Sequence, residues 1–169
     1  MKVLIVDDDR ATVDVIRCTM DWEKLGIAEV YEAYNISMAQ EILLKQAVDI
    51  VISDIEMPQG SGLDLLAWFR EEHMEGEFLL LTCHEKFSYA TDAVKLHAAE
   101  YILKPFDADV MEAALKKLVL KIKEDRQIRQ ERQYGQWVVQ NKRQLQLSFL
   151  EDVFSGKLED EAELVDEIY

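Results

Sequence analysis

VLIVDDD (Val3–Asp9) decides how this chain folds, because four large apolar residues in a row lead directly into three aspartates. An apolar run without alternation is typical of a β-strand that is buried on both faces. Runs of the same kind occur at Ile50–Ile52, Phe78–Leu81 and Tyr101–Leu103, whereas Ala28–Tyr34 alternates as an edge strand does. We predict a strand in each of these five segments.

Stretches with helical periodicity lie between the predicted strands, at about residues 10–24, 36–46, 62–74 and 86–97. Asn35 and Ser61 stand just before two of these stretches, and both side-chain types cap the N-termini of helices. Strict alternation of strands and helices predicts an α/β protein with a doubly wound parallel sheet. Right-handed crossovers then place helices on both faces of that sheet.

The alternation stops after Pro105, and a helical pattern extends from there to about Phe154. We predict a compact domain over residues 1–122 and a helical linker or dimerisation extension over residues 123–169. The first part of the predicted helix carries an apolar stripe that can cover the sheet, formed by Met111, Leu115, Leu118 and Ile122.

A second apolar stripe lies in the extension and consists of Tyr134, Val138, Leu145, Phe149 and Val153, with Asn141 in the same seam. This spacing resembles that of a coiled coil or a docking face. An amphipathic helix that folds back on its own domain accounts for the stripe equally well, so both interpretations stay open.

The composition excludes several classes of protein. The chain has 169 residues, 49% of them hydrophobic and 31% charged, which is typical of a globular protein. Its net charge of −15 disfavours binding of nucleic acid or of an anionic membrane by this chain. No apolar stretch approaches the roughly 20 residues of a membrane span, and the short N-terminal run does not resemble a signal peptide. We therefore expect a cytoplasmic protein.

Cysteine is scarce in this chain. Cys18 and Cys83 alone cannot form a disulfide framework or a four-ligand zinc site. Both have apolar neighbours along the sequence, so we expect reduced thiols inside the core.

Polar side chains stand where the predicted strands end, and in open α/β sheets ligands bind beyond those carboxyl ends. These side chains are Asp7, Asp8 and Asp9 after the first strand, Asp54 after the third, Thr82 after the fourth and Lys104 after the fifth. Aspartates gathered at one edge repel one another unless a cation is bound, and Mg²⁺ prefers such hard oxygen ligands. Asp9 alone is equally well explained as a helix cap.

Four motifs, VLIVDDD, SDIEMPQGSGLDLL, LLLTC and YILKPF, resemble those of the receiver domain of two-component response regulators, the CheY-like family. The resemblance covers residues 1 to about 120, and the spacing of Asp54, Thr82 and Lys104 fits the family. It implies a flavodoxin-like fold with strand order 2-1-3-4-5.

The resemblance also implies a role for each acid. Asp54 is the expected phospho-acceptor, a carboxylate that attacks phosphorus and forms an acyl phosphate. Asp8 and Asp54 are expected to hold Mg²⁺ together with the main-chain carbonyl of Glu56, and Asp7 acts through a water on the metal. The metal offsets charge on the phosphoryl oxygens as they are transferred.

The remaining positions of the family pattern are implied in the same way. Lys104 is expected to pair with one phosphoryl oxygen, and the hydroxyl of Thr82 with another. Tyr101 occupies the position of the switch aromatic. The bond between Lys104 and Pro105 is expected to be cis, the isomer that proline makes accessible.

Some positions depart from the common pattern. Glu56 and His84 flank the expected site at positions that vary in the family, so the lifetime of the phosphoryl group stays open. Cys83 follows Thr82, and it is larger than the Ala or Gly that many members of the family have at this position. His97 stands where many members have Gly, and His tolerates a positive φ less well.

Two further stretches, KFSYATDAVKLHAAEYILKPFDADVMEAALKKL and LQLSFLEDVFSGKLEDE, resemble regulators whose output is an AraC-type helix-turn-helix domain. No such domain lies within these residues, so we expect a fragment of a transcription regulator. The implied partners are a sensor histidine kinase and a second copy of the chain. The second copy is expected to bind through residues 86–97, the fifth strand, the fifth helix and the extension.

Two other functions compete with this interpretation. A Mg²⁺-dependent phosphatase with an aspartate nucleophile requires a second acid two residues later as its general acid, and Glu56 stands at that position. The single-domain size of the chain and its lack of a cap insertion argue against this function. An effector-less docking module without metal chemistry is disfavoured by the full set of acids, Thr82 and Lys104. The expectation is a signalling switch rather than an enzyme with a diffusible product.

Overall fold

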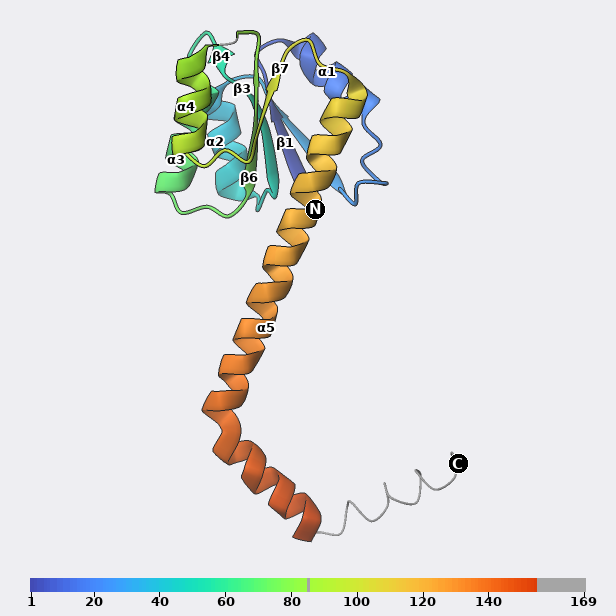
Figure 1. The fold of residues 1–169 in the computed structure, drawn as a ribbon, viewed down its shortest axis with the longest axis vertical. Coiled ribbons are helices and arrows are strands. Elements are labelled where there is room, and N and C mark those ends of the chain that lie inside the picture. Colours follow the sequence, from blue (N-terminus) through green and yellow to red (C-terminus); the bar gives the residue numbers. More distant parts are fainter. Residues whose placement is uncertain (85, 155–169) are drawn as a thin grey trace. The chain divides into compact units, whose positions relative to one another are not determined.

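A computed structural model describes residues 1–84 and 86–154 of the chain, and beyond residue 139 it describes the side chains of residues 141, 142, 146 and 147 only. The chain divides after Glu124 into two units, Met1–Glu124 and the remainder. The first unit contains every strand and most of the helices of the described chain (Figure 1).

A five-stranded parallel sheet forms the centre of the first unit, in the order β2-β1-β3-β6-β7. Its strands are β1 (Lys2–Val6), β2 (Glu29–Ala33), β3 (Ile50–Asp54), β6 (Glu77–Thr82) and β7 (Glu100–Leu103). In sequence order this is 2-1-3-4-5, so the predicted flavodoxin-like topology is confirmed, including the edge position of the alternating strand β2. Val6 pairs with Ser53, which brings the ends of β1 and β3 together.

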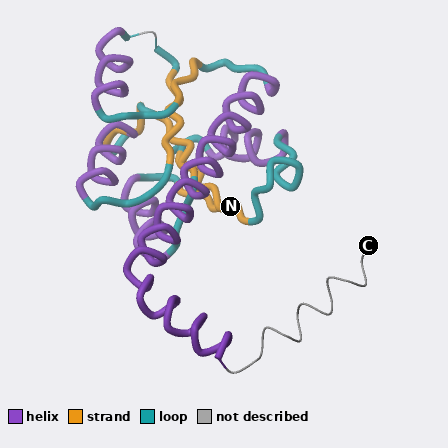
Figure 2. Tube along the Cα trace, turned by 60° about the horizontal axis from the view of Figure 1, so that its bottom comes forward, coloured by secondary structure: helices purple, strands orange, loops and turns teal. Residues whose placement is uncertain are grey.

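Five helices accompany the sheet: α1 (Arg10–Thr19), α2 (Ile36–Lys45), α3 (Gly62–Glu71), α4 (Phe87–Lys95) and α5 (Ala108–Phe154). A short hairpin of β4 (Glu56–Met57) and β5 (Gly60–Ser61) follows β3. The strands lie between layers of helix (Figure 2). Asn35 and Ser61 cap α2 and α3 as predicted, and Asp9 caps α1 by accepting a hydrogen bond from the N–H of Ala11.

Two apolar clusters fill the space between the sheet and its helices. The first joins α1 and α5 to one face and includes Ile5, Ile16, Ile52 and the predicted stripe Met111, Leu115, Leu118 and Ile122. The second joins α2, α3 and α4 to the other face and includes Leu4, Leu43, Leu65, Phe69 and Phe78. Burial on both faces explains why β1 and β3 are continuous apolar runs.

Helix α1 ends five residues earlier than predicted. Beyond Thr19 the chain turns, and the indole N–H of Trp22 donates to the carbonyl of Arg17, a group near the end of the helix. The apolar residues after Thr19 pack as a loop against the first cluster, which explains why their spacing looked helical.

The prediction of core thiols was wrong, since both Cys18 and Cys83 are exposed. In α1 the buried residues are Val13 and Ile16, and Cys18 lies about 200° around the helix from Ile16, on the solvent side. Cys83 follows the fully buried Thr82, just beyond the end of β6. Apolar neighbours along the chain therefore did not place either side chain in the core.

His97 lies in the turn that follows α4 and has a φ of 57°. This is the left-handed region that glycine adopts without strain and that a residue with a Cβ adopts less readily. His97 therefore occupies a conformation for which the family pattern favours Gly.

Candidate functional site

Three aspartates meet at the carboxyl edge of the sheet. Asp7 and Asp8 follow β1, Asp54 is the last residue of β3, and these strands are neighbours. One carboxylate oxygen from each of the three lies within 4.8 Å of the others. Asp7 and Asp54 are buried, whereas Asp8 is exposed. The predicted cluster is therefore assembled in space, with one member open to solvent.

Lys104 reaches this cluster from the end of β7. Its Nζ lies 2.6 Å from Oδ2 of Asp7 and 2.7 Å from Oδ1 of Asp54. Burial by itself lowers the pKa of the ammonium, but its contacts with Asp54 and Asp7 outweigh this and raise the pKa above its ordinary value. The peptide bond between Lys104 and Pro105 is cis, as expected.

The two oxygens of the Asp54 carboxylate are held in different ways. Its Oδ2 accepts a hydrogen bond of 3.1 Å from the N–H of Glu56. Oδ1 is buried and accepts no hydrogen bond of good geometry from the residues that the structure describes, so its contact with Lys104 is an ion pair. Burial raises the pKa of Asp54 above its ordinary value, and Lys104 and the Glu56 N–H act against this.

Oδ1 of Asp54 is the observation on which a metal can be tested, because its one contact in the described structure is the ion pair with Lys104. A buried carboxylate oxygen without a hydrogen-bond donor is costly, and a cation or a new covalent bond removes that cost. The three carboxylates are hard donors of the kind that Mg²⁺ takes, and exposed Asp8 leaves room for the waters that this ion keeps. Asp7 already accepts from Lys104 and from the N–H of Asp9. The site therefore fits Mg²⁺.

Gly62 brings α3 against the acceptor strand. A Cβ at this position would lie 2.2 Å from the carbonyl oxygen of Asp54 and 2.8 Å from Oγ of Ser53. Only glycine allows α3 to begin so close to the end of β3. Its φ is not in the left-handed region, so the requirement here is one of space.

Thr82 and Tyr101 contact the same backbone carbonyl. Thr82 is fully buried, and its Oγ1 accepts from the N–H of His84 at 3.1 Å and donates to the His84 carbonyl at 3.3 Å. The hydroxyl of Tyr101 donates to that carbonyl at 3.4 Å. The structure therefore links the two predicted switch residues through His84.

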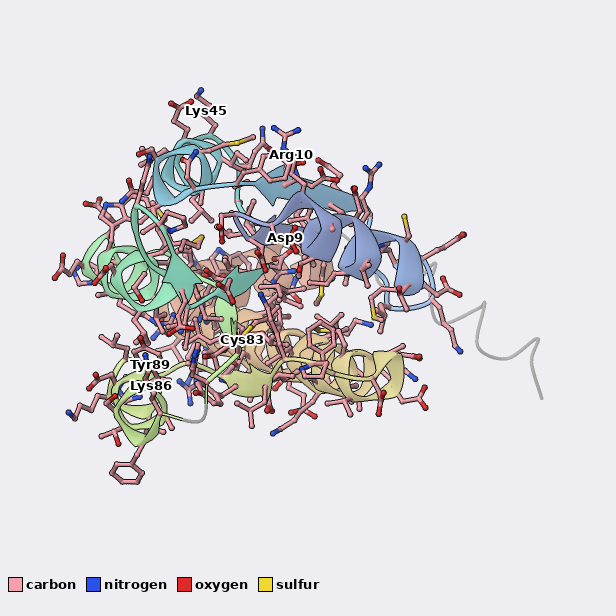
Figure 3. All side chains as sticks on the ribbon, turned by 90° about the horizontal axis from the view of Figure 1, so that it is seen from above. Asp9, Arg10, Lys45, Cys83, Lys86 and Tyr89 are labelled. Carbon is pink, nitrogen blue, oxygen red and sulfur yellow. The ribbon has the colours of Figure 1, made fainter. Side chains whose placement is uncertain are left out.

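A group of residues beside the site was not predicted as a unit. The carboxylate of Glu56 contacts the imidazole of His84, the ammonium of Lys86 and the hydroxyl of Tyr89. Figure 3 looks down on this edge of the sheet and labels Lys86 and Tyr89 next to each other at α4. No local pattern in the sequence indicates these contacts, because they join residues 28 to 33 positions apart.

An open groove of about 580 Å³ lies beside Lys104, between α1 and the segment after β7. Its walls are mostly apolar and include Val15, Cys83, Pro105 and Phe106. Exposed Cys83 is therefore part of this groove rather than of the core.

The profile of the response regulator receiver domain matches residues 3–116 of the chain. The chain belongs to the receiver domain family of response regulators. It is 30% identical over 122 residues to the transcriptional regulatory protein YesN of Bacillus subtilis, covering 72% of this chain and 33% of YesN. It is 34% identical over 118 residues to the sensory transduction protein LytR of Staphylococcus epidermidis, covering 70% of this chain and 46% of LytR.

Solved structures agree with this membership. The REC domain of AraT, a response regulator from Geobacillus stearothermophilus, has a TM-score of 0.69 and 32% identity, over 74% of this chain and 97% of that one. This receiver chain thus spans a third to about half of the curated relatives named above. No helix in the described part of the chain combines the length and the apolar character of a membrane span.

Proposed function

We propose that this receiver domain accepts a phosphoryl group on Asp54 from a sensor histidine kinase, and that it passes the resulting change to a partner surface. The observation that carries the proposal is the buried Oδ1 of Asp54, which accepts no hydrogen bond of good geometry from the described residues and lies 2.7 Å from the ammonium of Lys104. A nucleophile needs an available lone pair, and the phosphoryl oxygens need a nearby cation. Both are present at this atom.

In the proposed reaction a carboxylate oxygen of Asp54 attacks phosphorus, and the bond from phosphorus to the donor breaks with its electron pair left on the donor. The N–H of Glu56 fixes the rotation of the carboxylate, and Lys104 offsets the charge of the phosphoryl oxygens. Mg²⁺, when bound, would supply further charge neutralisation, and Asp8, Asp54 and the main-chain carbonyl of Glu56 would hold it together with Asp7. The hydroxyl of Thr82 then bonds one of the new oxygens.

The groove beside Lys104 suits the approach of the phosphodonor. It is open and apolar, and Lys104 itself lines it. Val15 is 59% exposed on α1 although it is a large apolar residue. A kinase surface that covers Val15 and Phe106 would exclude water from the acceptor while the group is transferred.

A second copy of the chain is the proposed partner of the face formed by α4, β7 and α5. The lysines of this face are paired within the chain, since Lys95 contacts Asp92 and Lys86 contacts Glu56. The apolar residues give better support, because Phe87 is 87% exposed and lies on the same side of α4 as exposed Val94.

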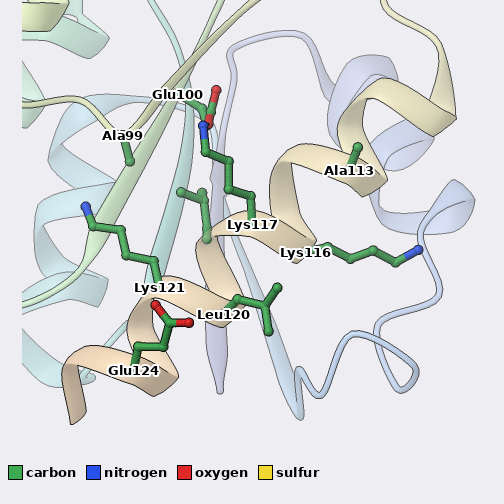
Figure 4. A pocket seen from close by; sticks show the side chains of 9 residues that line it. Ala99, Glu100, Ala113, Lys116, Lys117, Leu120, Lys121 and Glu124 are labelled. Carbon is green, nitrogen blue, oxygen red and sulfur yellow. The ribbon is translucent and has the colours of Figure 1, made fainter. Parts of the chain in front are cut away.

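A groove of about 700 Å³ continues this face at the start of α5 (Figure 4). Exposed Leu120 lines it beside Lys117 and Lys121, and these lysines pair with Glu100 and Glu77. Apolar surface of this kind is commonly buried by a partner.

The extension, residues 123–169, is proposed to support this dimer. Tyr134 and Trp137 are exposed and their rings stack on each other at 6.3 Å between centroids. The side chains of Leu145, Phe149 and Val153, which belong to the predicted second stripe, lie outside the described residues. A paired helix over this stripe would set the spacing of two output domains.

Control of transcription is the proposed output. YesN bears the name of a transcriptional regulatory protein, and it extends well beyond the aligned region. The proposal assigns DNA binding to a further domain of AraC type rather than to this acidic chain, and a cytoplasmic location follows from it.

The competing phosphatase would use Glu56 as a general acid. Lys86 and His84, together with Tyr89, hold the pKa of the Glu56 carboxyl below its ordinary value, which makes it a poor proton donor at neutral pH. A time course with a small acyl phosphate as donor separates the two functions. We expect labelling that stops near one phosphoryl group per chain; steady hydrolysis over many turnovers would contradict the proposed function.

A further inference from the structure

The Glu56 carboxylate holds three groups, two from His84 and Lys86 just before α4 and one from Tyr89 in its first turn. Lys86 lies 3.1 Å from Oε1, and the hydroxyl of Tyr89 donates to the same oxygen at 3.2 Å. The imidazole of His84 contacts Oε2. Lys86 Nζ also lies 3.2 Å from the Tyr89 hydroxyl, so the contacts form a closed network. One side chain of the β4 segment therefore fastens the N-terminal end of α4.

Among the described residues at that end of the helix, the ring of Tyr89 packs against the second apolar cluster, and the burial of the helix is otherwise small. Ala93 is the one residue of α4 that is fully buried, and the N-cap residue Lys86 makes no capping hydrogen bond with its side chain. Phe87, the first residue of α4, is 87% exposed. The N-terminal turn of α4 is thus held by the Glu56 contacts together with the packing of the Tyr89 ring.

The other end of α4 is tied to its surroundings by different contacts. The guanidinium of Arg70 donates to the carbonyl of His97 at 3.0 Å and to that of Gly76 at 3.1 Å. The N–H of Ala98 donates to the carbonyl of Ala93 at 2.8 Å. If the Glu56 contacts open, α4 can turn about its C-terminal end without losing these bonds.

One hydrogen bond connects the network directly to the acceptor, and further bonds connect it to Thr82. The N–H of Glu56 donates to Oδ2 of Asp54, so any change in that carboxylate acts on the backbone of Glu56. The backbone of His84 bonds Oγ1 of Thr82, while its side chain contacts Glu56. A movement of Thr82 toward a new phosphoryl oxygen therefore withdraws a support of His84.

We propose that the Glu56 carboxylate is a latch on the N-terminal end of α4, and that it releases Lys86 and Tyr89 when Asp54 carries a phosphoryl group. The trigger rests on the proposed function, whereas the latch exists in the protein without any ligand. Exposed ion pairs are individually weak, so such a latch opens with a small change in free energy. Its release frees the helix that bears Phe87 and Val94 for a partner.

Hydrogen exchange of the full chain, read by mass spectrometry over Tyr89–Lys95, tests the latch. Lys86→Ala and Tyr89→Phe cut it from the α4 side and alter nothing at Asp54; Glu56→Ala cuts it from the other side. We expect about fivefold faster exchange in each variant, the change that the loss of a modest surface network produces. Asp92→Asn is the matched control, because it breaks the pair with Lys95 on the same helix, and its exchange should equal that of the wild type.

Exchange rates equal to the wild type in all three latch variants would overturn the latch. Equal acceleration in Asp92→Asn would overturn it too, since α4 would then respond to any lost ion pair. Exchange over β1 serves as the check that each variant is folded, because its residues Val3 to Val6 are fully buried.

A second arm adds beryllofluoride with Mg²⁺ as the phosphoryl mimic, and its binding is followed separately by fluorine NMR. We expect the wild type to gain exchange over Tyr89–Lys95 until it matches Lys86→Ala, and Lys86→Ala to gain little more. If the mimic binds and wild-type exchange does not change, the release step is wrong although the proposed function stands. If the mimic does not bind at all, the release step and the proposed function both fail, and the first arm alone decides on the latch.

Discussion

The ammonium of Lys104 lies 2.7 Å from Oδ1 of Asp54, although β6 separates their strands in the sheet. The lysine side chain therefore spans a whole strand to reach an acceptor that is 7% exposed. Because Oδ1 accepts no hydrogen bond of good geometry in the described structure, this ion pair is the main compensation for its burial. The pair explains both how the acid pocket is tolerated in the folded protein and why it can react.

Removal of the Lys104 charge should lower the stability of the folded protein, because the buried carboxylates then lose their counter-charge. Lys104→Met leaves the buried carboxylates of Asp7 and Asp54 without their common cation, and loss of one partner of a buried ion pair costs about 3 kcal/mol. We expect the free energy of unfolding in urea to fall by that amount without Mg²⁺ and by clearly less with millimolar Mg²⁺. A variant as stable as the wild type in metal-free buffer would show that the pair does not compensate the buried charge.

Addition of Mg²⁺ should stabilise the wild type. Like charges that share a site repel, and an ion that binds only the folded state adds about 2.7 kcal/mol at 100 times its Kd. We expect millimolar Mg²⁺ to raise the Tm of the wild type and of Asp9→Ala, in which the cap of α1 is lost but the cluster is intact. Asp8→Ala should lose the response. The same Tm for the wild type with and without Mg²⁺ would argue against a metal site.

Gly62 should tolerate no side chain. Gly62→Ala places a Cβ 2.2 Å from the Asp54 carbonyl, and relief of such a clash in a packed region costs about 1–3 kcal/mol. We expect lower stability together with slower phosphorylation, measured on the same preparation. Gly135→Ala is the control, because its Cβ meets nothing within 4 Å and the position lies inside α5. It should leave both measurements no worse than wild type, since alanine favours a helix over glycine.

The acceptor should control the association of two chains. We expect beryllofluoride with Mg²⁺ to tighten a two-fold dimer, seen by sedimentation across a concentration series. Thr82→Ala removes the hydroxyl that contacts the His84 backbone and should uncouple the mimic from the dimer. A mimic that binds without changing the dimer constant would place the output elsewhere, in release of the extension.

The sequence predicted those parts of the fold that depend on local patterns. The continuous apolar run of β3 and the alternation of β2 identified central and edge strands, because burial on two faces and on one face select different residues. Asn35 and Ser61 marked helix starts, since their side chains bond the first free N–H groups. Helix ends were less accurate, as the early end of α1 shows.

The predicted strand ends located the acids and Lys104 of the candidate site, but they did not indicate which atoms these side chains contact. The link between Thr82 and Tyr101 through the carbonyl of His84 depends on a backbone atom, which no residue type reveals. The contacts of Glu56 with Tyr89 likewise depend on where α4 lies after folding. The position of Cys83 was misjudged for the same reason, because exposure is decided by the turn after β6 rather than by neighbours in the sequence.

The most direct test of the central claim is intact and peptide mass spectrometry after incubation with a small phosphodonor, with and without Mg²⁺. The account predicts one added phosphoryl group that depends on Mg²⁺ and maps to Asp54, is absent from Asp54→Ala and persists in Asp9→Ala. Full labelling of Asp54→Ala, or labelling that maps to another residue, would contradict it.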